Sequence, residues 1–179
     1  MDKNLDSSII FKAKSGDIKS FEKLVREYQK QVRVFIFSFF GNIDLVDEIS
    51  QEVFIKVFKR LKKLRDIHGF KKWLFKITRN ICIDYYRKSK KNKTLSEFNE
   101  SISVSDENIE EKFILKEDIK TSLLKLNTEE RKTMILIYYL GFSYKEAAEI
   151  LNCPVKTIDS RIYRASKKLI NILPNKHEI

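Results

Sequence analysis

The chain has 179 residues, of which 42% are hydrophobic and 34% are charged, so it can bury one large core or two small ones. It contains four glycines and two prolines, which argues against a loop-rich sandwich or barrel. The formal net charge of +11 favours a polyanionic partner, and charge alone does not distinguish a nucleic acid from a membrane surface.

The charge is distributed in three blocks. Residues 1–92 carry 22 Lys and Arg against 11 Asp and Glu, residues 93–118 carry 3 against 8, and residues 119–179 carry 11 against 6. The segment from Lys91 to Glu111 is rich in Ser, Asn and Glu and shows no apolar period, which predicts a flexible linker. We therefore predict an all-α protein with two small helical domains, 1–90 and 112–179, joined by a flexible acidic linker over 91–111.

Apolar residues of the N-terminal block recur at helical spacing and predict a helical bundle. A first helix follows Gly16, with Asp17 as its N-cap and with an apolar stripe formed by Phe21, Leu24, Val25, Tyr28, Val32, Phe35, Ile36 and Phe39. A second helix is expected from about Asp44 to Leu64, with Val46, Ile49, Val53, Val57 and Leu61 turned inward. A third follows the break at His68-Gly69, with Phe70, Trp73, Leu74, Ile77 and Ile81 on one stripe.

Two features of this bundle exceed what a core requires. Glu48 and Glu52 lie one helical turn apart within a basic domain, together with Asp47 and Gln51. They form either a solvated face with local pairing, such as Glu52 with Lys56, or a docking surface for a basic partner. The third helix carries Lys71, Lys72, Lys76, Arg79, Asn80, Arg87 and Lys88, interleaved with Trp73, Tyr85 and Tyr86. That pattern fits either a solvated basic helix with core aromatics or a surface for a nucleic-acid strand.

The C-terminal block carries the most specific pattern. A helix is predicted over Asn127–Leu140, capped by Asn127 with Glu130 three residues later and ended by Gly141. Ser143 and Glu146 then form a capping box that begins a short helix. Asn152 and Cys153 make a turn, and Pro154 suits the first position of a last helix.

This last helix is amphipathic. It is expected to bury Val155, Ile158, Ile162, Ala165 and Leu169 and to present Lys156, Thr157, Asp159, Ser160, Arg161, Tyr163, Arg164, Lys167 and Lys168. Two helices joined by a tight turn, the second displaying polar and basic side chains, are typical of a DNA-binding helix-turn-helix. A helical hairpin used for protein contacts is the alternative.

Nothing in the sequence indicates catalysis or a cofactor. We find no Gly-rich phosphate loop, no Ser/His/Asp set and no metal-ligand cluster, so we expect no enzyme activity, no metal and no small-molecule substrate. Cys82 and Cys153 lie far apart among apolar neighbours, as buried reduced thiols do. No signal peptide or membrane-spanning run is evident, which predicts a cytoplasmic protein.

Taken together, these motifs resemble the extracytoplasmic-function sigma factors of bacterial RNA polymerase, from about Ile9 to Leu169. DEISQEVFIKVFKRL (Asp47–Leu61) is similar to the family's region 2.2, and FKKWLFKITRNICIDYYR (Phe70–Arg87) is similar to its regions 2.3 and 2.4. The helix-turn-helix is similar to region 4.2. The third domain of larger sigma factors is absent.

The resemblance implies an alternative sigma factor that directs promoter-specific initiation. Region 2.2 would dock on the clamp helices of the largest polymerase subunit, through Asp47, Glu48, Gln51, Glu52 and Phe54. The following loop and helix would recognise and melt the minus-10 element and hold a flipped base, through Leu64, Arg65, Asp66, His68, Lys71, Lys72, Lys76, Arg79 and Asn80. The minus-35 element would be bound by Lys156, Thr157, Asp159, Ser160, Arg161, Tyr163, Arg164 and Lys168.

The resemblance also implies further partners. These are the flap of the second-largest polymerase subunit, promoter DNA and an anti-sigma factor, while the acidic linker would pass near the RNA path. Lys156 and Asp159 depart from the family's pattern, and a carboxylate in a recognition helix accepts from cytosine N4 but repels phosphate. Two other classes stay open: a conventional DNA-binding regulator, which needs no polymerase, and a basic helical protein that binds RNA or a membrane surface.

Overall fold

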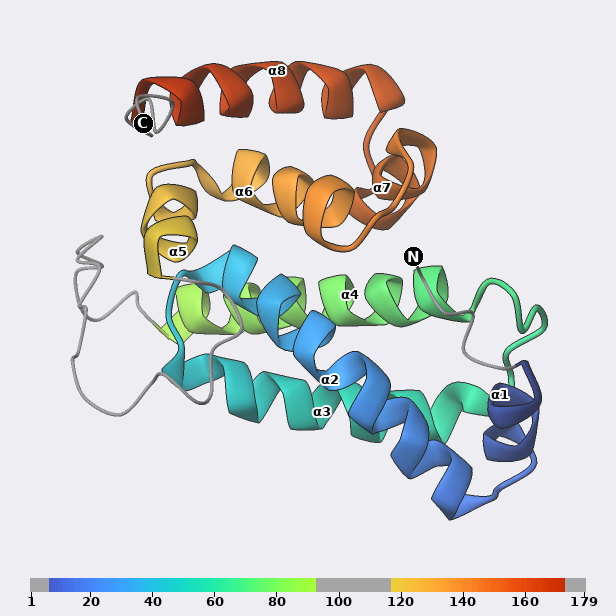
Figure 1. Cartoon of the computed structure of the whole chain (residues 1–179). Coiled ribbons are helices and arrows are strands. Elements are labelled where there is room, and N and C mark those ends of the chain that lie inside the picture. The colour runs from blue at the N-terminus through green and yellow to red at the C-terminus, as the bar shows by residue number, and fades with distance from the viewer. Residues whose placement is uncertain (1–6, 93–116, 173–179) are drawn as a thin grey trace. The chain divides into compact units, whose positions relative to one another are not determined.

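The computed structural model describes residues 7–92 and 117–172 (Figure 1). Within these ranges every regular element is helical, which confirms the predicted all-α class. The chain divides into two compact units, residues 1–36 with 43–100 and residues 37–42 with 101–179. Most of the expected acidic linker, residues 93–111, lies outside the described residues.

The first unit contains α1 (Ser7–Lys14), most of α2 (Ile18–Phe40), α3 (Asp44–Leu61) and α4 (Phe70–Asn92). The amide of Ser20 donates to Asp17 Oδ2 at 3.0 Å, so Asp17 caps α2 as predicted. The hydrogen bond from the Ser20 side chain, followed by the one from its amide, holds the pKa of the Asp17 carboxyl below its usual range. α2 and α3 run antiparallel, because Phe21 stacks edge-on against Phe58 with ring centroids 4.9 Å apart while Arg33 pairs with Asp47.

The core of the first unit follows the predicted stripes. The five inward residues of α3 are at most 1% exposed, and Phe70, Leu74, Ile77 and Ile81 of α4 are buried as well. Trp73 is half-buried and lies beside the Phe70 ring, with centroids 6.0 Å apart. α3 ends at Leu61 rather than at Leu64, because the amides of Lys63 and Leu64 turn back to carbonyls three residues earlier.

The second unit contains α5 (Glu117–Leu124), α6 (Thr128–Met134), a π-helical segment η1 (Ile135–Tyr139), α7 (Tyr144–Leu151) and α8 (Val155–Ile172). The predicted single helix over Asn127–Leu140 is therefore interrupted. The Leu140 amide reaches back five residues to the Ile135 carbonyl at 2.9 Å, which makes one wide turn before the exit at Gly141 (φ +71°).

Both predicted capping boxes are present. The Asn127 side chain accepts from the Glu130 amide, and the Ser143 side chain accepts from the Glu146 amide. In each box the glutamate carboxylate accepts in turn from the backbone amide of the cap residue. Asn152 adopts the left-handed conformation (φ 54°) that ends α7 and turns the chain into α8. α8 begins one residue after Pro154.

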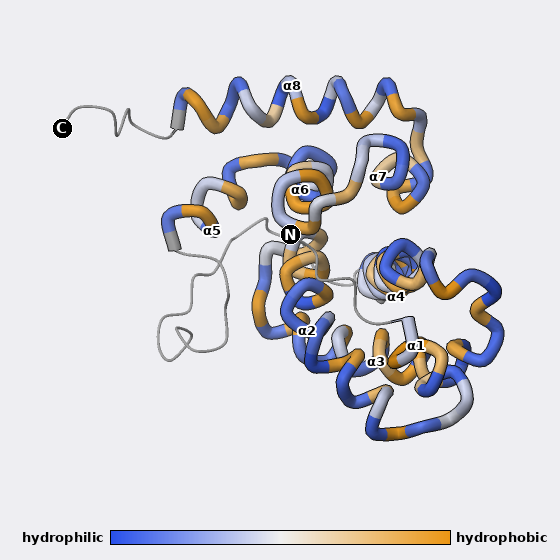
Figure 2. Tube along the Cα trace, turned by 45° about the vertical axis from the view of Figure 1, so that its right-hand side comes forward, coloured by the Kyte–Doolittle hydropathy of each residue, from blue (hydrophilic) through white to orange (hydrophobic). Residues whose placement is uncertain are grey.

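α8 packs against α6 and α7 along its apolar edge. Figure 2 shows hydrophobic residues on the edge of α8 that faces α6 and α7 and hydrophilic residues on the outer edge. Ile158, Ile162 and Ala165 are buried as predicted, and Leu169 is half-buried. The prediction for Val155 was wrong: it is 46% exposed, because a side chain in the first helical turn leans beyond the helix end.

Candidate functional site: three surfaces for a macromolecular partner

The first surface is the acidic face of α3, formed by Glu48, Gln51 and Glu52, all of which are exposed. The three residues lie at i, i+3 and i+4 and therefore share one side of the helix. The hydroxyl of Tyr85 on α4 hydrogen-bonds the Glu48 carboxylate, and this bond, followed by partial burial, raises the pKa of Tyr85. Tyr85 thus orients one carboxylate of the acidic face, a role that spacing along the chain did not reveal.

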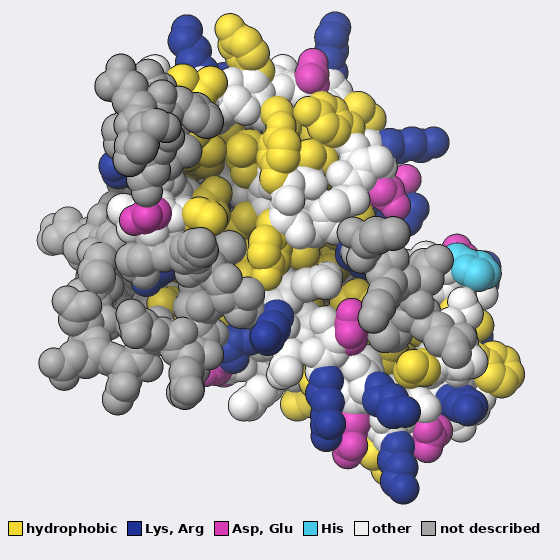
Figure 3. All heavy atoms as spheres, viewed as in Figure 1, with side chains coloured by type: hydrophobic (Ala, Val, Ile, Leu, Met, Phe, Trp, Pro, Cys, Tyr) yellow, Lys and Arg dark blue, Asp and Glu magenta, His cyan; other side chains and the backbone are white. Residues whose placement is uncertain are grey.

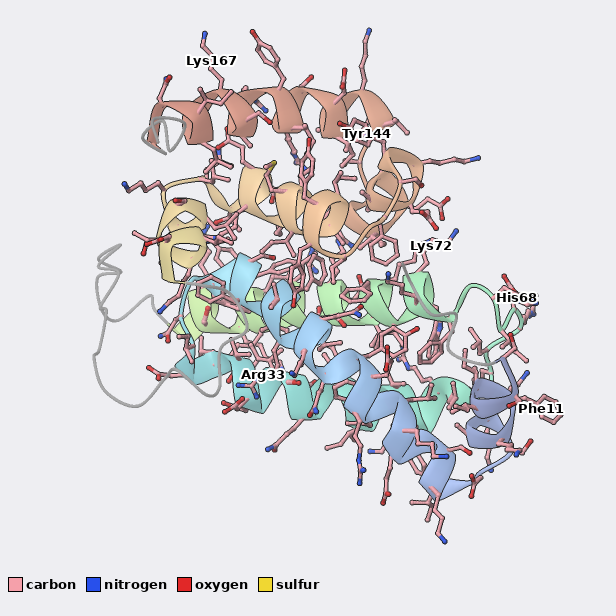
Figure 4. The ribbon with its side chains drawn as sticks, in the orientation of Figure 1. Phe11, Arg33, His68, Lys72, Tyr144 and Lys167 are labelled. Atoms are coloured by element: carbon pink, nitrogen blue, oxygen red, sulfur yellow. The ribbon has the colours of Figure 1, made fainter. Side chains whose placement is uncertain are left out.

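Asp47 and Phe54 lie beside this face and are less exposed than its three residues. Both are half-buried. Asp47 forms an ion pair with Arg33 of α2, whose side chain is 20% exposed (Figure 4). Part of the Asp47 carboxylate is therefore engaged in joining α2 to α3.

Two apolar residues on the outside of α3 were missed by sequence reasoning. Ile55 is 54% exposed and follows Gln51 and Glu52 by one turn, and Phe58 is 46% exposed. Ile55 is out of phase with the inward residues Val53 and Val57, which was the available signal. The outer side of α3 thus combines carboxylates with exposed apolar side chains, as protein interfaces do.

The second surface comprises the loop between α3 and α4 and the outer side of α4. In the loop, Arg65, Asp66 and His68 are exposed, whereas Leu64 is only 6% exposed and anchors the loop in the core. The amide of His68 donates to Asp66 Oδ1 at 2.9 Å, which makes a local turn. Figure 4 labels His68 in this loop and Lys72 in the first turn of α4.

On α4 the predicted basic residues do not all share one face. Lys72, Lys76 and Arg79 follow helical spacing, with Asn80 beside them. The Arg79 guanidinium donates to Asn80 Oδ1 at 3.1 Å, so these two side chains are held together. Lys71 lies about 140° round the helix from Lys76 but about 80° from Arg79, at the margin of this stripe.

The third surface is the outer edge of α8. Lys156, Ser160, Tyr163, Arg164 and Lys167 are exposed, with Tyr163 at 70%. Lysine and arginine side chains project from this edge in Figure 3, and Figure 4 labels Lys167 among them. Thr157 is half-buried.

Three other predicted residues of α8 lie on its flanks. Arg161 donates to Glu129 of α6 at 2.6 Å and lies 3.7 Å from the Cys153 sulfur. Lys168 reaches the buried carboxylate of Glu130 at 2.7 Å. Both cations are therefore engaged inside the unit, which the sequence alone did not show.

Asp159 lies on the opposite flank of α8 and is exposed. The pKa of the Tyr144 hydroxyl, at the start of α7, is raised first by burial and then by Tyr138 and the Asp159 carboxylate. Asp159 therefore lies close to Tyr144, whose hydroxyl also hydrogen-bonds Tyr138.

Residues 7–92 and 117–172 hold no group of three or more His, Cys, Asp or Glu side chains that could bind a metal ion. They also hold no helix that is long and apolar enough to span a bilayer. Cys82 is buried as predicted, while Cys153 is only half-buried.

The chain matches two family models. Residues 24–92 match Sigma-70 region 2, and residues 116–169 match Sigma-70, region 4. The ECF RNA polymerase sigma-E factor of Haemophilus influenzae is 30% identical over 93% of this chain and 94% of its own length. The sigma-E factor of Escherichia coli K12 is 30% identical over 93% of both chains.

Solved structures agree with these matches. The sigma factor RpoE of Bartonella quintana, in complex with the anti-sigma factor NepR, is 28% identical with a TM-score of 0.74 and covers 89% of this chain and all of its own. CnrH, in complex with the cytosolic domain of CnrY, is 26% identical with a TM-score of 0.66 and covers 96% and 98%.

Proposed function

This chain belongs to the extracytoplasmic-function sigma factors, which direct bacterial RNA polymerase to promoters, and we propose which of its surfaces carries each step. Members of this family are initiation factors rather than catalytic enzymes, so the chemistry of RNA synthesis belongs to the polymerase. We place the protein in the cytoplasm with that enzyme. We assign residues 1–90 to core binding and minus-10 recognition, 91–111 to the linker and 112–179 to minus-35 recognition.

The acidic face of α3 is the docking surface for the clamp helices of the largest polymerase subunit. The observation that carries this assignment is a pair of exposed carboxylates, Glu48 and Glu52, in an otherwise strongly basic unit. Tyr85 hydrogen-bonds Glu48, and the exposed Ile55 and Phe58 border the pair. A basic partner with apolar side chains complements such a surface in charge and shape. We identify that partner as the clamp helices because the resemblance of this segment to region 2.2 implies it.

The loop after α3 and the stripe Lys72, Lys76, Arg79 and Asn80 bind the minus-10 element as an opened strand. Lysine and arginine contact phosphates, and Asn80 offers amide donors to a base or sugar. Extruding a base costs a few kcal/mol, which contacts in the loop must offset. Lys71, at the margin of this stripe on the side of Arg79, adds positive charge to the same surface.

Replacing Asn80 with Ala is expected to slow promoter opening about tenfold and to leave closed-complex formation nearly unchanged, because the lost amide contacts form on the opened strand. Permanganate footprinting over time measures opening, and a filter-binding assay measures the closed complex. Asn80→Asp keeps an acceptor for Arg79, removes the amide donors and adds a negative charge, so it should slow opening at least as much as Asn80→Ala. Equal losses in both steps would count against a melting role.

The outer edge of α8 binds the minus-35 element in the major groove. Lys156, Ser160 and Tyr163 occupy the positions that face base edges, while Arg164 and Lys167 suit phosphates. Thr157 is half-buried and lies at the border of this face. Arg161 and Lys168 contribute indirectly, because their ion pairs with Glu129 and Glu130 hold α8 against α6. Asp159 lies close to Tyr144 at the start of α7.

Substitutions of Arg164 and Arg161, both on α8, distinguish DNA binding from packing within the second unit. Arg164→Ala is expected to weaken minus-35 binding by about 1–3 kcal/mol, because an exposed direct contact is lost. Arg161→Ala is expected to lower the free energy of unfolding by about 1 kcal/mol or less, because its partner Glu129 is half exposed. Footprinting and denaturant unfolding on both variants measure the two effects. Identical DNA-binding defects would refute the division.

We also propose an anti-sigma factor as a partner, since two structurally similar proteins were solved in complexes of that kind. The flap of the second-largest subunit is the expected polymerase contact of the second unit. The whole assignment is tested by run-off transcription with sigma-free core polymerase on a genomic promoter library. Specific starts that depend on this protein support it, whereas duplex binding without core polymerase favours a conventional regulator.

A further inference from the structure

Tyr85 lies where the core of the first unit meets the acidic face of α3. It follows Ile77 and Ile81 at four-residue intervals on α4, and both isoleucines are buried in the core. Because α4 packs against α3, this spacing places the half-buried ring of Tyr85 beside α3. Its hydroxyl bonds the Glu48 carboxylate, so α4 supplies a polar contact to a surface that α3 forms.

Glu48 and Glu52 present two like charges one helical turn apart, and such a pair repels itself. The hydrogen bond to Glu48 contributes most to raising the pKa of Tyr85, followed by burial and by the charges of Glu48 and Glu52. The phenol therefore lies close to both carboxylates. Its hydrogen-bond donor opposes their repulsion by fixing the direction of one of them.

Asp47 shows the other way in which a carboxylate of α3 is held. Its partner is the guanidinium of Arg33, whose positive charge cancels much of the attraction that Asp47 could offer to a basic partner. The hydroxyl of Tyr85 is a neutral donor, and the raised pKa of Tyr85 keeps the hydroxyl protonated. The bond from Tyr85 thus orients the Glu48 carboxylate and leaves its negative charge available.

We propose that Tyr85 is a positioning residue for polymerase docking, whose hydroxyl holds the Glu48 carboxylate ready for a basic partner without neutralising it. The inference rests on the proposed docking of the acidic face on the clamp helices. A glutamate side chain that is already ordered loses less conformational entropy when the partner binds. Removal of the hydroxyl is therefore expected to weaken core binding while the ring still fills its place in the unit.

The first test measures the affinity of full-length variants for sigma-free core polymerase by surface binding. Tyr85→Phe removes only the hydroxyl and is expected to bind about five- to tenfold more weakly, the size of one net hydrogen bond. Tyr85→Lys restores a donor but adds a positive charge, so it should bind at least as weakly as Tyr85→Phe. Tyr86→Phe changes the neighbouring tyrosine, which is 56% exposed, and as the matched control it should bind as the wild type does.

A double-mutant cycle separates positioning of Glu48 from a general effect on the fold. In a Glu48→Ala background, Tyr85→Phe should have almost no further effect on core affinity, whereas a loss that acts through the fold would persist. Glu48→Ala should also lower the pKa of Tyr85 toward its ordinary value, because the hydrogen bond and the nearby charge are both removed. NMR titration of 13C-labelled tyrosine measures this change, and Tyr85→Phe identifies the signal.

The outcomes distinguish the role of Tyr85 from the role of the acidic face. Equal losses from Tyr85→Phe in both backgrounds, or wild-type affinity in Tyr85→Phe or Tyr85→Lys, would overturn the positioning role and leave the acidic face as the docking surface. If Glu48→Ala and the charge-reversed Glu48→Lys/Glu52→Lys variant both bind core polymerase as the wild type does, the docking proposal fails together with this inference.

Discussion

Reversing the charges of Glu48 and Glu52 to Lys is expected to lower the affinity for core RNA polymerase at least about 100-fold while the first unit stays folded. Each substitution removes an attraction to the basic clamp helices and adds a repulsion, and like charges facing one another at an interface cost several kcal/mol. Both residues are exposed on α3, so their replacement leaves the core residues of the helix in place. Native gel shift or surface binding to purified core measures the loss.

The control for this prediction changes the same amount of charge elsewhere. Glu27 on α2 and Asp84 on α4 are exposed carboxylates of the same unit that lie on helices other than α3. A Glu27→Lys/Asp84→Lys variant should retain binding within about threefold, because long-range charge effects are screened at physiological salt. Fluorescence of Trp73, the single tryptophan, checks that both variants are folded. If both double variants lose binding equally, docking depends on net charge and the acidic face is not its site.

Much of the fold could be predicted from the sequence because its signals are local. Stripes such as Val46, Ile49 and Val53 report which side of a helix is buried, and capping residues such as Asn127 and Ser143 report where helices begin. The interruption at η1 was missed because hydrophobic periodicity does not distinguish a wide turn from a regular one over five apolar residues.

The candidate sites were predictable as surfaces but not residue by residue. Leu64 and Arg161 both lie in segments that match the family's motifs, yet one is buried in the core and the other pairs with Glu129. Partners that lie on another helix leave no pattern at short sequence separation, so Tyr85 beside Glu48 was equally invisible. The helical phase of Ile55 does indicate that its side chain lies outside the core. Its exposed side chain adds an apolar residue beside the acidic face.

The largest effect on stability is expected at Glu130. Its side chain is 1% exposed, and its carboxylate bonds Lys168 of α8 at 2.7 Å and 3.0 Å and the Asn127 amide at 3.3 Å. The Glu130 side chain therefore completes the capping box at the start of α6 and also joins α6 to α8. Glu130→Ala should lower the free energy of unfolding of the second unit by about 2–3 kcal/mol, because a charge-assisted hydrogen bond and a cap bond are lost together.

Hydrogen–deuterium exchange of peptides from α6 and α8 measures this loss, with Trp73 fluorescence reporting separately on the first unit. A loss of 2–3 kcal/mol corresponds to exchange faster by about 30-fold or more where amides exchange through unfolding of the unit. Glu130→Gln separates the two contributions, since its amide oxygen can still accept from Asn127 but carries no charge for Lys168. We expect its effect to lie between wild type and Glu130→Ala. If all three proteins exchange alike, the contact between Glu130 and Lys168 does not stabilise the helix-turn-helix, and Lys168 becomes available again as a DNA-binding residue.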